Sequence, residues 1–594
     1  MRRFAWPALV LLAGFFGLGV GVVWGRRPPA PPEAPILTKV TSLEVLRKHS
    51  RELRKEVVQV TPSVHVAVGY GLANSILVEG PEGAVVIDVQ ASQEEGAEVA
   101  QAFAAITDKP LRAIVYTHNH TDHIFGAQAF IDRLARKGEP VEVFAHESTN
   151  ALIDRLVSYY SPIITRRSLR MFGTFLDQEG VVNAGIGPQL GLRADSHLGV
   201  VRPTRTVHDR LEVQVAGLDL VLVHAPGETP DQLYVWFPAE RVLAPGDNLY
   251  RSFPNLYTIR GTPYRDPLDW VASLDGMRAL HPEHLVPSHT RPLSGREHIQ
   301  QTLRDYRDGI QYVHDQTVRW INRGLEPDEI VARVRLPERL AASPYLKELY
   351  GTVEWSVRSV FAGNLGWFGG NPSQLQPLAP KARAERLATL VGGSDALRVA
   401  TRDALDRGDY QWALELTDAL RALTPEDSEV AKLRVAALTS LGARSSNPNA
   451  RHYFLTSAAE SAGRLQVPPR FGVPTDAMLK SLPVERFIRA LTVYFDPAKA
   501  EAQEIAFAFD FPDLVQGYTL RLRGGIVEVQ PGVREDAAVV ARVDSLRFKQ
   551  VLAGRRDSLA GLVQSLEVTR GSSVELARLL LKFDRPEAAP RRAP

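Results

Sequence analysis

The residues best suited to chemistry gather in one short segment, Thr117-His118-Asn119-His120-Thr121-Asp122-His123. It directly follows the apolar run RAIVY, which predicts a strand that ends in this loop. Imidazole and carboxylate groups are ligands that divalent zinc prefers. Packing alone rarely collects three histidines and an aspartate in so few residues, because such neighbours compete for protons. The segment therefore predicts a metal site at the end of a strand.

One loop cannot complete two metal sites, so further donors must come from other strand ends. Asp247 ends the segment RVLAPGD, and His289 ends LVPSH. The stretch PGETPDQ follows the run VLVHA and offers Glu228, Asp231 and Gln232. Catalytic groups of α/β folds collect at such junctions between strands and loops. We therefore expect these side chains to join the histidine segment.

Two other histidines, His146 and His224, also end strand-like runs. A single histidine at such a position is more often a buried structural residue than a ligand. We expect both to be structural, with a role in the site as the alternative.

The pattern of apolar runs divides the chain into parts. Between residues 57 and 295, short strand-like runs alternate with helix-like stretches, which is an α/β pattern. The expected strands are 85–89, 112–118, 141–146, 218–227, 233–238 and 284–289, with a helix at 94–106. From 296 to 463 only helical periodicity remains, at 297–323, 379–391, 394–407, 410–423 and 426–441. A linker at 464–475 precedes a mixed α+β part, 476–590, with a hairpin turn at 523–525 and a closing helix at 573–583.

The N-terminus, residues 1–27, carries a long uncharged stretch at 4–25. As a helix this stretch would extend about 33 Å, enough to cross the hydrocarbon core of a bilayer. It is either an uncleaved membrane anchor or a cleaved secretion signal, and its length favours the anchor. The Pro-rich segment 28–35 opens the lead-in 28–56 and predicts a stiff spacer. We expect a membrane-anchored or secreted protein outside the cytoplasm.

The overall composition excludes several classes of protein. Apolar residues make up 44% and charged residues 23% of the 594 residues, which is typical of folded domains. With 70 basic and 68 acidic residues the net charge is +2, so the chain has no general attraction for nucleic acid. It contains no cysteine, which excludes disulfides and thiol catalysis.

Residues 57–295 resemble the metallo-β-lactamase superfamily, which implies an α/β fold of the αββα sandwich type. The resemblance implies that His118 and His120 bind a first metal. Asp122, His123 and His289 would bind a second metal, and Asp247 would bridge the two. Asp88, in VVIDV, resembles the aspartate of the superfamily that orients these ligands.

Longer segments resemble the alkylsulfatase branch of that superfamily. The segment 245–266 resembles its catalytic domain, and 306–324 and 350–372 resemble its all-α dimerisation domain. Residues 476–590 resemble its sterol-carrier-type C-terminal domain. The resemblance thus implies a homodimer, and a C-terminal fold that encloses a hydrophobic cavity.

The chain departs from the family pattern at three positions. Gln232 takes the place of a metal ligand that is glutamate in alkylsulfatases, so Asp231 or Glu228 would have to substitute; we expect Asp231. Asp247 stands where alkylsulfatases have glutamate, and Gly369 stands where they have aspartate.

Two arginines follow Asp247 and suit an anionic substrate. The planar fork of arginine donates paired hydrogen bonds to a tetrahedral oxyanion. The resemblance places Arg260 in the sulfate-binding region. We take Arg260 and Arg265, together with Asp122, as candidate catalytic residues, while Asn255 and Tyr257 could position a leaving group.

The expected function is hydrolysis by a dinuclear metal centre. Two zinc ions, or other divalent metals, would activate a water to hydroxide. The most specific expectation is cleavage of an alkyl sulfate, a small amphiphilic anion, to alcohol and sulfate. One alternative is hydrolysis of another ester, a lactone, a phosphodiester or a lactam on the same scaffold. The other is an amphiphile-binding protein whose metal site is vestigial.

Overall fold

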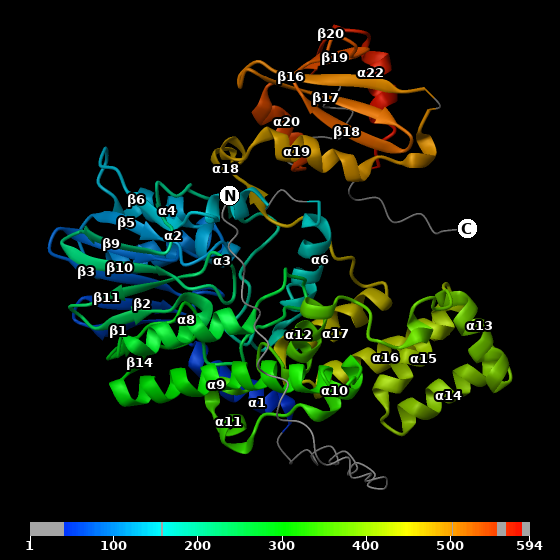
Figure 1. Cartoon of the computed structure of the whole chain (residues 1–594), viewed down its shortest axis with the longest axis horizontal. Coiled ribbons are helices and arrows are strands. Elements are labelled where there is room, and N and C mark those ends of the chain that lie inside the picture. The colour runs from blue at the N-terminus through cyan, green and yellow to red at the C-terminus, as the bar shows by residue number, and fades with distance from the viewer. Residues whose placement is uncertain (1–40, 156–158, 502, 555–565, 585–594) are drawn as a thin grey trace, which may run out of the picture. The chain divides into compact units, whose positions relative to one another are not determined.

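The computed structural model describes residues 41–155, 159–501, 503–554 and 566–584 (Figure 1). The expected anchor at 4–25 and the spacer at 28–35 lie outside the described residues. Within the described ranges, no helix combines the length and the apolar character that a membrane span requires.

Two sheets form the centre of the first part of the chain. The first has the order β1-β2-β3-β4-β5-β6-β8 and the second the order β14-β13-β12-β11-β10-β9. The first sheet consists of β1 (Glu56–Thr61), β2 (Val64–Val68), β3 (Ser75–Gly80), β4 (Gly83–Ile87), β5 (Leu111–Val115), β6 (Glu142–His146) and β8 (Arg205–Val207). The second consists of β9 (Arg210–Val215), β10 (Leu218–His224), β11 (Leu233–Phe237), β12 (Val242–Ala244), β13 (His284–Leu285) and β14 (Leu293–Ser294).

The core lies between the two sheets, and alternation along the strands explains it. Val85 and Ile87 of β4 share one buried cluster with Leu220 and Leu222 of β10. The intervening Val86 belongs to a different buried cluster, on the outer face of its sheet. Successive side chains of a strand point to opposite faces, so a strand covered on both sides must be apolar throughout.

Helices cover the outer faces of both sheets. On the first sheet, α2 (Gln93–Ala104) and α4 (Ala127–Leu134) contribute buried Phe103 and Phe130. On the second, α8 (Pro267–Ala279) and α9 (Arg296–Ile321) contribute buried residues such as Leu274 and Leu303. Full burial of each such side chain contributes about 1.5–3 kcal/mol. The layers are therefore helix, sheet, sheet, helix, which confirms the expected αββα sandwich.

Helix α9 starts at residue 296, where we predicted the helical domain to begin. Its buried side, however, packs against the sandwich. Its side chains share a cluster with the second sheet and with α8. The remaining helices of this region are α10 (Pro327–Arg333), α11 (Glu338–Ala342), α12 (Val353–Leu365), α13 (Pro380–Val391), α14 (Ser394–Asp406), α15 (Tyr410–Leu423), α16 (Ser428–Arg444) and α17 (Pro448–Ser461). Their ends carry clear signals: Asp409 and Asp427 cap the N-termini of α15 and α16 with their side chains.

The C-terminal part is a five-stranded sheet with helices. Its order is β18-β17-β16-β19-β20. The strands are β16 (Ile505–Phe511), β17 (Gln516–Arg523), β18 (Ile526–Pro531), β19 (Val539–Arg542) and β20 (Glu567–Arg570), and the helices are α18 (Asp476–Ser481), α19 (Val484–Leu491), α20 (Ser545–Leu552) and α22 (Ser573–Leu580). The predicted hairpin turn is confirmed, because Gly524 and Gly525, both with positive φ, link the paired residues Arg523 and Ile526.

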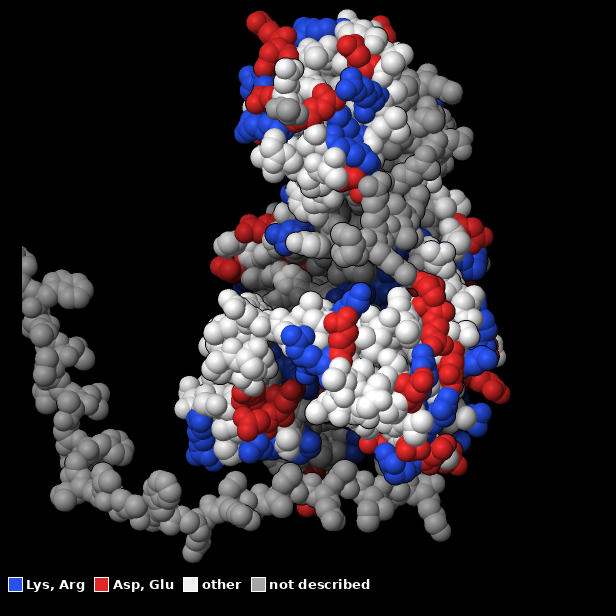
Figure 2. Space-filling model, turned by 90° about the vertical axis from the view of Figure 1, so that its right-hand side faces the viewer, with Lys and Arg blue, Asp and Glu red and all other residues white. Residues whose placement is uncertain are grey.

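Acidic and basic side chains are interspersed on the face of the molecule in Figure 2. That distribution agrees with the small net charge of +2.

Candidate metal centre

The predicted donors come together at one end of the sandwich. The histidine segment follows β5, and its second half forms the short helix α3 (Thr121–Ile124). Asp247 lies in the 3-10 turn η2 (Gly246–Asn248), which follows β12, and His289 follows β13. Because β4 and β5 are parallel, as are β12 and β13, the loops after each pair leave the same end of their sheet.

The side chains form two groups of possible metal ligands. One group is His118, His120 and Asp247; the other is Asp122, His123 and His289. Within each group the donor atoms lie within 4.8 Å of one another. Oδ2 of Asp247 links the groups, because it lies 3.8 Å from Nε2 of His118 and 3.2 Å from Nε2 of His289.

The geometry of the second group fits a divalent metal. Oδ2 of Asp122 lies 3.5 Å from Nε2 of His123 and 3.6 Å from Nε2 of His289. A tetrahedron with metal–ligand bonds of about 2.0–2.2 Å has edges of about 3.3–3.6 Å. Nε2 of both histidines is buried and has no hydrogen-bond partner within the described residues. Buried nitrogens without partners are costly unless a ligand satisfies them, so these residues fit the metal that the fold implies.

Asp88 orients the histidine segment. Its carboxylate accepts hydrogen bonds from the backbone N–H (2.8 Å) and the hydroxyl (2.9 Å) of Thr117 and from the hydroxyl of Ser288 (2.6 Å). It also lies 2.8 Å from Nδ1 of His123, which leaves Nε2 of that ring to face the centre. This arrangement is the one expected for an aspartate that holds a metal-binding imidazole.

Burial and charge set the protonation of the donors. Burial lowers the pKa of His118 and of His120 well below the ordinary value, so both rings are neutral and can bind a cation. For His123, burial opposes protonation, but the carboxylates of Asp247, Asp122 and Asp88 outweigh it and raise the pKa. Burial likewise opposes ionisation of Asp247, but the surrounding histidines outweigh it and hold its pKa well below the ordinary value.

The structure corrects our expectation that Asp231 completes the first group. Its two oxygens accept hydrogen bonds from the hydroxyls of Thr149 and Thr229, both at 2.7 Å, and it belongs to neither ligand group. Glu228 comes close instead, with Oε1 3.9 Å from Nδ1 of His120. The loop after β10 turns Glu228 toward the centre and Asp231 toward the threonines.

Gln232 is buried beneath the turn that carries Asp247. Its side-chain amide donates to the carbonyl oxygen of Leu233 at 3.0 Å. The neighbouring Gly246 has φ +60°, and a Cβ there would lie 2.0 Å from the Gln232 amide nitrogen. Only glycine therefore fits between Gln232 and Asp247.

The two candidate arginines occupy different places. Nη2 of Arg260 lies 3.1 Å from Nε2 of His120, at the edge of the centre, and burial lowers its pKa. Arg265 is buried behind Glu228: Nη1 lies 2.9 Å from Oε1 of Glu228 and donates to the carbonyl oxygen of Asn255. The contacts of Arg265 are therefore to Glu228 and Asn255 and not to the two ligand groups, and a catalytic role for it stays a prediction.

Asn255 is buried beside the same carboxylate, with Nδ2 3.5 Å from Oε1 of Glu228. Tyr257 is partly exposed and has no described hydrogen bond to the candidate ligands. Gly369 lies elsewhere, in the helical region beside Pro327 and Gln374.

Three tyrosines around Glu228 escaped the sequence reasoning. The hydroxyl of Tyr250 donates to Oε2 of Glu228 at 3.3 Å, and its ring packs edge-on against Tyr306 and Tyr350. Burial, and then the charge of Glu228, raise the pKa of all three tyrosines well above the ordinary value. Tyr306 and Tyr350 come from the helical part of the chain, so no local pattern could have linked them to the centre.

His146 and His224 lie outside both ligand groups, and a structural role for them stays a prediction. Their rings stack on each other with centroids 4.0 Å apart. Nδ1 of His146 lies 2.7 Å from the hydroxyl oxygen of Ser148, and Nε2 of His224 lies 2.8 Å from the carbonyl oxygen of Pro230.

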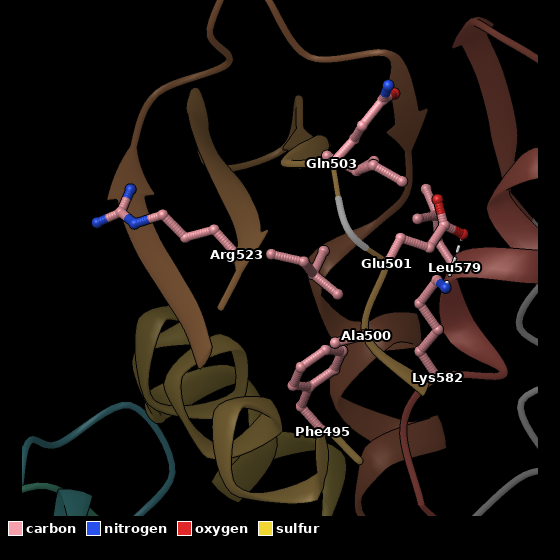
Figure 3. A pocket seen from close by; sticks show the side chains of 9 residues that line it. Phe495, Ala500, Glu501, Gln503, Arg523, Leu579 and Lys582 are labelled. Carbon is pink, nitrogen blue, oxygen red and sulfur yellow. Dashed lines mark hydrogen bonds and ion pairs between the residues drawn. The ribbon is translucent and has the colours of Figure 1, made fainter. Parts of the chain in front are cut away.

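The C-terminal part has a small cavity where β16 begins and β17 ends (Figure 3). Phe495, Leu522 and Leu579 line it, and the ion pair between Glu501 and Lys582, 2.8 Å apart, lies beside them. Its volume is about 10 Å³, which is too small for an alkyl chain. Within the described residues, Phe509 and Phe511 of β16 pack against Phe548 of α20, with ring centroids 5.1 Å apart, so the expected lipid-sized space does not lie at this cavity.

Comparisons with known proteins agree with this architecture. The family model of the metallo-beta-lactamase superfamily matches residues 68–289, that of alkyl sulfatase dimerisation matches 326–463, and that of the alkyl sulfatase C-terminal domain matches 474–589. A linear primary-alkylsulfatase of Pseudomonas sp. (strain ATCC 19151) is 38% identical over 86% of this chain and 99% of that protein. An (R)-specific secondary-alkylsulfatase of Pseudomonas sp. is 27% identical over 89% of this chain and 80% of that protein.

A solved structure is similar throughout. The stereoselective inverting sec-alkylsulfatase from Pseudomonas sp. is 25% identical, with a TM-score of 0.81, and the match covers 92% of this chain and 86% of that one. The sandwich and its cluster of histidines and carboxylates define a metal-dependent hydrolase of the metallo-β-lactamase superfamily. Within it, the chain belongs to the alkylsulfatase family, which confirms the resemblance seen in the sequence.

Proposed function

We propose that this protein hydrolyses linear primary alkyl sulfates to the alcohol and inorganic sulfate. The observation that carries the proposal is the placement of Arg260 at the edge of two linked ligand groups, 3.1 Å from His120. The 38% identity to a linear primary-alkylsulfatase supports this choice of substrate.

Two zinc ions are the metals that we propose for the centre. The first ion would be held by His118, His120 and Glu228. The second ion would be held by Asp122, His123 and His289. Asp247 would contribute to both sites. When bound, such a pair supplies Lewis acidity and lowers the pKa of a coordinated water toward about 7.

Arg260 would bind the sulfate group. A sulfate monoester is an anion and repels an incoming hydroxide, so a positive charge beside it lowers the barrier to attack. Arg260 is half-buried, and charge interactions in such a place are stronger than in water. Tyr250 by a hydrogen bond and Arg265 by an ion pair would hold the carboxylate of Glu228 in place beside His120.

Metal content and turnover measured together test the proposal. We expect about two metal ions per chain by elemental analysis and release of sulfate from dodecyl sulfate. The variant H120A should lose turnover and part of the metal, whereas H146A, which removes a strand-end histidine outside both groups, should keep both. Two metals without sulfate release would contradict the substrate, and a chain without metal would favour an amphiphile-binding protein.

We also propose that the protein is a homodimer. The family model of alkyl sulfatase dimerisation supports this, as do exposed apolar side chains in the same region, among them Leu365, Trp367, Leu375, Leu378 and Leu390. Where such side chains form a contiguous patch, they favour a protein partner.

Finally, we propose an extracytoplasmic location, with residues 4–25 as a membrane anchor. The proposal rests on the uncharged character of that stretch. Fractionation of cells that produce the full chain would test it: recovery from the membrane after a salt wash supports an anchor, and a shortened soluble form supports a cleaved signal.

A further inference from the structure

The loop that carries Arg260 is fastened to a helix of the same domain. Helix α6 (Ser161–Met171) runs alongside this loop, and Arg167 of α6 donates two hydrogen bonds to it. Its Nε and Nη2 lie 2.9 and 2.5 Å from the carbonyl oxygen of Ile259. Both lone pairs of that single oxygen can thus be occupied by one guanidinium.

The carbonyl of Ile259 belongs to the peptide unit that begins Arg260. A peptide unit is planar, so an orientation imposed on its C=O also sets the N–H and the Cα of the next residue. Holding this oxygen therefore limits the directions in which the side chain of Arg260 can leave the backbone.

Two more contacts fasten the same loop to α6. The hydroxyl of Thr258 lies 3.2 Å from the sulfur of Met171. On the other side of Arg260, Gly261 has φ +105°, and a Cβ on it would lie 3.0 Å from Cδ1 of Ile164. The residues before Arg260 are thus bonded to this helix, and the residue after it lies close to the same helix.

Helix α6 is itself anchored. Arg170 forms a bidentate ion pair with Glu460 of α17, with distances of 2.7 and 2.8 Å. Nδ1 of His452, also on α17, lies 3.0 Å from the carbonyl oxygen of Met171. The helix can therefore serve as a rigid support for the loop.

We propose that Arg167 is a positioning residue that aims the Arg260 guanidinium at the sulfate group of the substrate. This inference rests on the proposed function. A displacement of about 1 Å of a substrate-binding group can lower a rate by as much as about 100-fold, so a support outside the site can control binding strongly.

The test uses R167M, which keeps an apolar stem but removes all donors, and R167K, which keeps one cationic donor. R166M is the matched control, because Arg166 lies next to Arg167 on α6 and its side chain has no hydrogen bond or ion pair within the described part of the chain. The measurements are KM and kcat with dodecyl sulfate, inhibition by inorganic sulfate, metal per chain and melting temperature.

We expect R167M to raise KM and the inhibition constant of sulfate about tenfold or more, with unchanged metal content. R167K should recover part of the loss, and R166M should match the wild-type protein. In an R260M background, R167M should change KM less than twofold, because the group that it positions is gone. If R167M fails to fold, the same comparison is made with R167K.

Two results would overturn the inference. One is an unchanged KM and sulfate inhibition in folded R167M or R167K while R260M weakens both; the proposed function would then stand without this support. The other is an equal effect of the Arg167 variant with and without Arg260. If R260M itself leaves sulfate affinity and turnover unchanged, the anion-binding role of Arg260 fails, and the inference about Arg167 fails with it.

Discussion

At the scale of single residues, the centre depends on which of two carboxylate side chains in the loop after β10 faces the histidines. Glu228 and Asp231 are three residues apart, both are buried, and both carry carboxylates. The hydroxyls of Thr149 and Thr229 satisfy Asp231, whereas Glu228 lies near His120. The two residues therefore have different roles despite the same chemistry.

Substitution of each carboxylate by its amide separates those roles. We expect E228Q to lose about one metal ion per chain and to lower kcat/KM by roughly 10–100-fold, the range found when partners in a metal site are changed. D231N should keep both metals, because its oxygen still accepts a hydrogen bond from one threonine. Elemental analysis with kinetics on both variants checks this, and metal loss from D231N alone would return Asp231 to the ligand set.

Proton competition at the second ligand group predicts how metal content varies with pH. The neighbouring carboxylates raise the pKa of His123 and of His289 against the effect of burial. A metal must displace those protons, so metal affinity falls as the pH falls. Dialysis at a series of pH values followed by elemental analysis should show metal lost on the acidic side. Metal content that is constant down to about pH 5 would be contrary to this expectation.

Because of Glu95, we expect the stability of the fold to decrease as the pH rises. Burial raises its pKa from 4.5 to about 7. The folded protein therefore binds this proton more tightly than the unfolded chain. Its contribution is complete below about pH 4.5 and is lost as the pH rises through about 7; at about 1.4 kcal/mol per pKa unit it amounts to roughly 3 kcal/mol.

Chemical denaturation between about pH 5 and 8 measures this contribution. The E95Q variant, which is neutral at every pH, should remove that part of the pH dependence. A curve for E95Q that runs parallel to the wild-type curve would show that Glu95 is not its source.

At the scale of elements, close approach of helices near the centre requires small residues. Gly96 of α2 lies against the start of α4, and a Cβ on it would come within 2.8 Å of the carbonyl oxygen of Gly126. Gly276, inside α8, has only the hydroxyl of Tyr234 nearby, at 3.9 Å. A methyl group would therefore clash with backbone at Gly96 but has room at Gly276.

The variants G96A and G276A exploit this contrast. We expect G96A to lower the free energy of unfolding by about 1–3 kcal/mol through overpacking against backbone. G276A should be neutral or stabilising by up to about 1 kcal/mol, since alanine has the higher helix propensity. Thermal unfolding of the two variants tests this expectation. If G96A were as stable as G276A, α2 and α4 could move apart without a cost in free energy.

At the scale of the whole molecule, we expect the exposed apolar side chains of the helical region to contact a second copy of the chain. Leu390, on α13, is 83% exposed. Val574, on α22 of the C-terminal part, is similarly exposed at 79% but lies outside the dimerisation match, so it provides a control.

We expect the double variant W367S/L390D to weaken dimerisation at least tenfold, because exposed tryptophan and leucine in an interface are replaced by polar groups. V574D should leave the association unchanged. Light scattering over a range of concentrations measures both. A variant that remains dimeric at the same concentrations as the wild-type protein would place the interface elsewhere.

Much of the helix and strand pattern could be predicted from the sequence. The apolar runs of β4, β5 and β10 and the helices α14 to α16, of which α15 and α16 carry side-chain caps, lie within a few residues of the expected ranges. Periodicity and capping are local signals, so each segment carries its own information. The histidine segment is equally local, because one loop after one strand holds four donors.

The class of fold, the family and a set of candidate donors thus follow from the sequence alone. The folded chain was needed to show that Glu228 rather than Asp231 lies near His120, that Arg265 lies behind Glu228, and that α9 packs on the second sheet. Those outcomes depend on the direction in which a loop leaves its strand and on which distant side chains meet it. Contacts between segments far apart in the chain leave no local pattern, so Tyr306 and the support of Arg260 by Arg167 became visible only in the folded chain.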